Sequence, residues 1–93
     1  MNKIEIHQQI CDEIHDLFVR KNHDYGDSFH LTYLEEGMVM PRIRLSDKFN
    51  RFKTLSRTKR QDVTDESLRD TLIDLANYSI MTILEMDLEN QNE

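Results

Sequence analysis

Apolar residues recur along most of the chain at the three-to-four-residue spacing of an amphipathic helix. In the first segment this stripe consists of Ile6, Ile10, Ile14 and Leu17, widened by Cys11 and Phe18. The spacing predicts a helix over Lys3–Arg20. Asn2, followed three residues later by Glu5, resembles a capping box and marks where this helix begins.

Two further segments have the same periodicity. A helix from Pro41 to about Ser56 is predicted, because proline suits the first helical turn and an apolar edge follows it. That edge consists of Leu45, Phe49, Phe52 and Leu55. A last helix from about Glu66 to Glu85, capped by Thr64 or Asp65, is predicted by its wide apolar face. This face consists of Leu68, Leu72, Leu75, Ala76, Ile80 and Ile83.

The intervening segments break the pattern. Residues 21–30 (KNHDYGDSFH) contain several turn formers around Gly26 and predict a loop. A short helix over Leu31–Glu36 follows and ends at Gly37. The polar segment RTKRQDVT connects the two long helices of the second half.

The predicted fold class is therefore all-α. We expect a small helical bundle of three main helices plus a short one, in a single domain of residues 1–86. The acidic C-terminal tail, residues 87–93, is expected to fray. A chain of 93 residues buries only about 60–65% of its unfolded surface, so we expect a homo-oligomer, a dimer or larger, to complete the core.

The charge balance narrows the partners. Acidic residues outnumber basic ones by 18 to 12, which argues against a duplex nucleic acid as the ligand, because such a ligand needs a basic surface. The chain has a single cysteine, Cys11, which fits a reducing compartment. We find no apolar run of about 18 residues and no signal-peptide pattern. The expected location is the cytoplasm, with no membrane partner.

A row of polar side chains follows the last predicted helix. Glu66, Asp70, Asp74 and Asn77 fall within a wedge about 80° wide at 100° per residue. Two carboxylates one turn apart repel each other unless a positive charge lies between them. Mg²⁺ would supply it, since this ion prefers oxygen ligands and often takes carboxylates together with substrate phosphates. The alternative is a solvated acidic stripe near the helix N-terminus, where the macrodipole favours negative charge.

Two other groups carry candidate binding chemistry. The predicted middle helix holds Arg44, Lys48 and Arg51, whose side chains can grip phosphate oxygens, and Asp47, which is a third metal ligand or an ion-pair partner. The predicted loop holds Lys21 for a phosphate, Asp24 for a metal or a sugar hydroxyl, and Tyr25 for stacking on a base. The alternatives are solvated surface charges in the helix and a helix end followed by a turn.

Three segments together carry a resemblance. KNHDYGDSF, RLSDKFNRFKTL and DESLRDTLIDLANYSIM resemble the nucleotide modification associated domain 1 family, found in many phages and prophages. That family is similar to the all-helical MazG-like nucleoside triphosphate pyrophosphohydrolases. The resemblance spans about residues 14–85. It implies an oligomerising bundle in which Mg²⁺ lies among helix-borne carboxylates and holds a nucleotide's phosphates.

The resemblance also assigns roles to residues. Asp70 and Asp74 become the catalytic acidic pair, and Glu66 and Asp47 become further metal ligands. The DYG-containing loop of the family corresponds to Lys21, Asp24 and Tyr25, and its D-K-x-x-R element to Asp47, Lys48 and Arg51.

Departures from the MazG-like pattern leave three functions open. Those enzymes carry an E-x-x-E pair on one helix and E-x-x-D on the next. Here the middle helix offers only Asp47, and the last has four-residue spacing. The first hypothesis is a nucleotide-binding, Mg²⁺-dependent pyrophosphohydrolase. The second is a non-catalytic phage protein, in the host cytoplasm, that sequesters a nucleotide signal of host defence. The third is a structural or interaction module.

Overall fold

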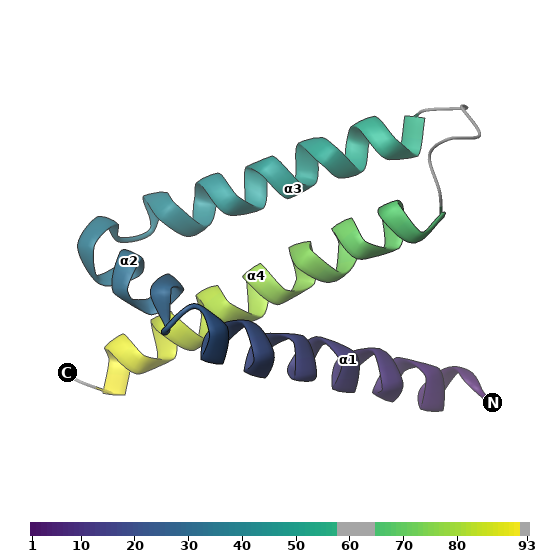
Figure 1. The fold of residues 1–93 in the computed structure, drawn as a ribbon, viewed down its shortest axis with the longest axis horizontal. Coiled ribbons are helices and arrows are strands. Elements are labelled where there is room, and N and C mark those ends of the chain that lie inside the picture. Colours follow the sequence, from purple (N-terminus) through teal and green to yellow (C-terminus); the bar gives the residue numbers. More distant parts are fainter. Residues whose placement is uncertain (58–64, 92–93) are drawn as a thin grey trace.

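The protein is all-α, as predicted (Figure 1). The computed structural model describes residues 1–57 and 65–91, of which residues 65 and 66 by their backbone alone. In this part of the chain there are four helices and no strand. They are α1 (Lys3–Asp24), α2 (Ser28–Glu36), α3 (Val39–Arg57) and α4 (Asp65–Gln91).

Two predicted helix ends are confirmed. The Oδ1 atom of Asn2 accepts the backbone N–H of Glu5 at 2.9 Å, which caps the first turn of α1. The Asn2 side-chain amide also donates to the Glu5 carboxylate at 2.9 Å. At the end of α2, Gly37 has φ 69°, and its N–H donates to the carbonyl oxygen of Tyr33 at 2.8 Å. Glycine adopts this positive φ without strain.

The predicted loop after the first helix is shorter than expected. α1 continues to Asp24, so Lys21 and Asp24 belong to its last turn, and α2 already begins at Ser28. No glycine or proline interrupts α1 before Gly26, and the reversal is made by two residues with φ 61°, Gly26 and Asp27. The side chains that we assigned to a loop are therefore held on a helix end.

The last helix is longer than predicted. α4 continues to Gln91, so residues 87–91 of the expected frayed tail are helical. α2 packs beside these last turns: His30 Nδ1 lies 2.5 Å from an oxygen of Glu85, and burial, with a further contribution from nearby Glu89, raises the pKa of the Tyr33 hydroxyl. The predicted cap Thr64 and residues 92–93 lie outside the described residues.

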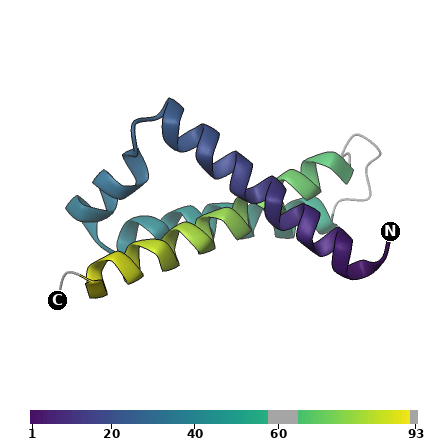
Figure 2. The same ribbon diagram turned by 90° about the horizontal axis from the view of Figure 1, so that it is seen from below.

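The helices form an open arrangement. α3 and α4 run antiparallel and share the largest interface, and α2 closes one end of the pair (Figure 1). α1 crosses them at an angle, and its N-terminal end projects from the body (Figure 2). Where α1 crosses α4, Arg69 of α4 donates two hydrogen bonds to Glu13 of α1, at 2.7 and 2.6 Å, and so links the two helices.

The apolar core is small for the size of the chain. Among the described residues, the buried apolar side chains are Pro41, Ile14, Tyr33, Met40 and Ile73. The radius of gyration is 15.2 Å, whereas a compact domain of this length has one of about 12 Å. Among the described helices, none combines the length and apolar character that crossing a membrane requires.

Candidate functional site

All four helices contribute to one cavity. Its volume is about 360 Å³, and it lies between the C-terminal turn of α1, α2, the start of α3 and the middle of α4. One part of its wall is aromatic or thioether-bearing and consists of Phe18, Tyr25, Phe29, Met40, Tyr78 and Met81. The rings of Phe29 and Tyr78 are stacked, with centroids 6.0 Å apart and planes inclined by 25°. This wall offers flat apolar surface to a planar ligand.

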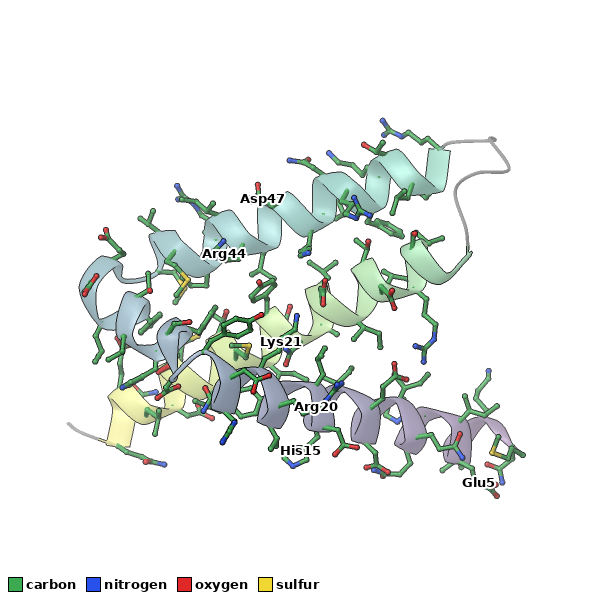
Figure 3. The ribbon with its side chains drawn as sticks, in the orientation of Figure 1. Glu5, His15, Arg20, Lys21, Arg44 and Asp47 are labelled. Carbon is green, nitrogen blue, oxygen red and sulfur yellow. The ribbon has the colours of Figure 1, made fainter. Side chains whose placement is uncertain are left out.

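A cluster of charges lies beside the aromatic wall. Asp74 of α4 forms ion pairs with two lysines. The Nζ atom of Lys48 in α3 lies 3.0 Å from Oδ2, and that of Lys21 in α1 lies 3.9 Å from Oδ1. Arg44 of α3 lines the same cavity. In Figure 3, Lys21 lies between α1 and α4, and Arg44 lies on the side of α3 that faces α4. Two cations therefore pair with Asp74, and Arg44 adds a third cation to the cavity wall. The four side chains together carry a net positive charge within an acidic chain.

Asn77 adds a polar group without a partner. It lies on α4, it is only 6% exposed, and it lines the cavity. Its Oδ1 atom is buried and accepts no hydrogen bond in the described part of the chain. Leaving a buried acceptor unsatisfied costs about 1–3 kcal/mol. An ordered water, a ligand or a partner chain can supply the missing donor.

The remaining predicted binding residues lie at the edge of the cluster or away from it. Arg51 donates through Nε to the hydroxyl of Thr71 at 3.2 Å, and so joins α3 to α4. Asp24 is exposed and lies 3.4 Å from the ring of His23, while Tyr25 lines the cavity mouth and is 68% exposed. The sequence predicts that all these residues form one binding site, but in the structure only some of them line the cavity.

The predicted metal ligands are dispersed. Asp47 lies on the outer side of α3, away from α4 (Figure 3), and Asp70 is exposed. The side chain of Glu66 lies outside the described residues. Within the described part of the chain, no three His, Cys, Asp or Glu side chains lie close enough to share a metal ion. Asp74 already faces ammonium groups at both oxygens, a donor set that does not fit Mg²⁺ held by protein carboxylates.

Sequence reasoning missed most of the cavity wall. Asn77 was placed only in the acidic row, and Phe18, Phe29 and Tyr78 were assigned no binding role. A signal was present at Asn77, since this amide belongs to the polar row of the last helix and directly precedes an aromatic residue, Tyr78. The aromatic wall has no local signal, because its members are spread over all four helices.

Comparison with known families gives a match that covers most of this cavity. Residues 21–86 match the family described as nucleotide modification associated domain 1. The chain belongs to this family. The match begins at Lys21 and includes every cavity residue except Phe18. No curated protein and no solved structure matches the chain. The similarity to MazG-like enzymes and the phage origin stay predictions.

Proposed function

We propose that this member of the family binds a nucleotide in the cavity between its four helices. The observation that carries the proposal is the division of the cavity into an aromatic wall and a cationic cluster around Asp74. A nucleotide has the matching division, with a planar base at one end and phosphate at the other. The cavity volume of about 360 Å³ is near the lower end for small-molecule sites, which favours a mononucleotide over a larger ligand.

The charge cluster suits phosphate. Arg44 can bind phosphate oxygens through two parallel hydrogen bonds, and Lys21 and Lys48 supply point charges. Asp74 holds both ammonium groups near the cavity, at 3.9 and 3.0 Å. A bound phosphate competes with this carboxylate for the two lysines.

The same cluster favours capture of a nucleotide over its hydrolysis. A pyrophosphohydrolase with Mg²⁺ on Asp70 and Asp74 needs free carboxylate oxygens, and those of Asp74 face two lysines. We therefore assign no metal-dependent step to these residues. The roles of Asp70 and Asp74 as a catalytic pair, and of Glu66 and Asp47 as metal ligands, stay predictions.

Calorimetry with nucleoside mono-, di- and triphosphates, with and without Mg²⁺, tests the proposal. We expect Lys21→Ala and Arg44→Ala each to weaken binding by about tenfold or more, the value of one charge-assisted hydrogen bond. Arg20→Ala and Arg42→Ala remove exposed cations of the same two helices that do not line the cavity, so affinity should stay unchanged. Absence of binding at millimolar nucleotide would refute the proposal. Release of pyrophosphate in the Mg²⁺ samples would assign hydrolysis instead.

We also propose that the chain works as a homodimer. Its accessible surface is 7379 Å², whereas a compact monomer of 11.2 kDa exposes about 5,700 Å². The excess of about 1,700 Å² per chain lies in the range that a chain buries in an obligate dimer. The outer face of α4 is one of the uncovered apolar surfaces, with Leu72, Ile80 and Ile83 at 42%, 51% and 57% exposure. A second copy of the chain is the occupant that offers an equally apolar surface.

A further inference from the structure

We propose that Asn77 reads the base of the bound nucleotide. In this arrangement the base lies against the aromatic wall, its polar edge meets the Asn77 amide, and the phosphate lies at Lys21 and Arg44. The inference rests on the proposed function and adds to it a residue that determines specificity. It is carried by two observations: Asn77 lines the cavity, and its Oδ1 atom is buried without a hydrogen-bond partner.

The position of Asn77 on α4 fits this role. It follows Asp74 by three residues, so their Cβ atoms lie about 5–6 Å apart on one helix face. It also precedes Tyr78, whose ring stacks with that of Phe29. The amide therefore shares one cavity with Asp74 of the charge cluster and with the stacked rings, within reach of the base of a ligand anchored by its phosphate.

The chemistry of the atom defines the class of ligand. A carbonyl oxygen of an amide only accepts hydrogen bonds, so the ligand must present a donor to it. Phosphate oxygens at neutral pH offer none, whereas base edges offer exocyclic amino groups and ring N–H groups. An asparagine amide pairs best with an edge that carries a donor beside an acceptor, as in its bidentate contact with N6 and N7 of adenine. We infer a base with such an edge.

A structural role makes a different prediction. A buried asparagine can instead fix the packing of helices at the expense of stability. In that case Asn77→Ala would leave the order of nucleotide affinities unchanged. A base-reading role requires that the variant lose discrimination between bases, which a packing defect does not produce.

The experiment compares AMP, GMP, CMP and UMP on the full chain. We expect wild type to prefer one base, and Asn77→Ala to weaken binding of that nucleotide by about 10- to 100-fold while bringing the four affinities within about threefold. Lys21→Ala should weaken all four alike and keep their order. A circular-dichroism melt checks that each variant is folded.

Base-methylated analogues test the same contact without a variant. An analogue of the preferred nucleotide with its donor group methylated should bind wild type as weakly as the parent nucleotide binds Asn77→Ala. If wild type binds nucleotides, Lys21→Ala weakens them, and both the analogue and Asn77→Ala leave the preference intact, this inference is wrong and the proposed function stands. If wild type binds none of the four, nor their di- and triphosphates at millimolar concentration, both fail.

Discussion

The two faces of α4 reverse the usual order of a surface helix. The face toward the rest of the protein buries polar side chains, namely Thr71, Asn77, Thr82 and Glu85. The opposite face leaves apolar side chains in solvent, namely Leu72, Ile80 and Ile83. In an amphipathic helix packed against a single core, the apolar stripe faces inward and the polar one outward. α4 therefore serves two different surfaces.

The inner face is polar but almost fully hydrogen-bonded. Thr71 accepts from Arg51 and donates to the carbonyl oxygen of Ser67, and Thr82 donates to that of Tyr78. Glu85 contacts the ring of His30. Within the described residues, Asn77 Oδ1 is the buried side-chain atom left without a partner, and it belongs to a residue that lines the cavity. In the proposals made above, a ligand completes the inner face beside this residue and a second chain covers the outer face.

Among the predicted changes, we expect a charge introduced on the outer face of α4 to have the largest effect, on the dissociation constant of the dimer. We expect Ile83→Glu to raise the dissociation constant of the dimer by about a hundredfold or more, because burying an unpaired carboxylate in an apolar interface is strongly unfavourable. Sedimentation equilibrium over a range of concentrations measures it. The matched control is Val19→Glu, which alters an equally exposed apolar residue of α1, at 50% against 57% exposure for Ile83.

Two results would contradict the comparison. Wild type that sediments as a monomer at tens of micromolar would show that one chain needs no apolar partner for α4. Equal dissociation by Val19→Glu would show that any exposed apolar residue of the chain matters, and that the outer face of α4 is not special.

Removal of the carboxylate on the inner face separates capture from metal-dependent catalysis. Asp74→Asn removes the carboxylate that Lys21 and Lys48 share, so the net charge of the cluster rises by one. Capture by the lysines predicts that nucleotide affinity is kept or rises about threefold to tenfold, since phosphate then meets less competing negative charge. A metal site on Asp74 predicts the opposite, a loss of Mg²⁺-dependent binding.

Asp70→Asn is the control for this measurement. It removes an exposed carboxylate four residues earlier on the same helix and changes the net charge equally. Affinity that rises in both variants alike would reflect overall charge. A selective loss in Asp74→Asn would overturn the capture model.

Helical periodicity predicted the fold because it is a local property. The stripe at Ile6, Ile10 and Ile14 and the caps at Asn2 and Gly37 are visible within a few residues of sequence. The helix ends at Asp24 and Gln91 were mispredicted, since that of α4 depends on contacts with residues of α2 more than fifty positions away. Local propensity cannot register such contacts.

The candidate site was accessible to sequence reasoning only in part. Charged side chains attract attention by their type, so Lys48 and Asp74 were named, and they do meet at 3.0 Å. Ile14 and Ile6 belong to the same apolar stripe of α1 and cannot be distinguished by their pattern in the sequence, yet Ile14 is buried and Ile6 is exposed. Which part of α1 packs is decided by the angle at which it crosses α4, which no residue pattern specifies (Figure 2).

The smallest expected effect is a pH dependence of stability at the end of the inner face. The hydrogen bond to Glu85 raises the pKa of His30 above its ordinary value, with smaller electrostatic contributions from Glu85 and Asp27, while partial burial opposes the rise. The folded protein therefore binds the imidazole proton more tightly than the unfolded chain does. This contribution to stability is complete below the unfolded pKa of 6.5 and is lost as pH rises through the higher folded value.

Melting temperatures measured from pH 5.5 to 8.5 test this contribution, and His30→Gln should abolish the part of the decrease that begins near pH 6.5. His15→Gln is the control, because His15 lies on the side of α1 away from the other helices (Figure 3), and its loss should leave the profile unchanged. Identical profiles for wild type and His30→Gln would show that the Glu85 contact does not depend on the proton. The inner face would then be held by neutral hydrogen bonds, and the charge at Glu85 would need another partner.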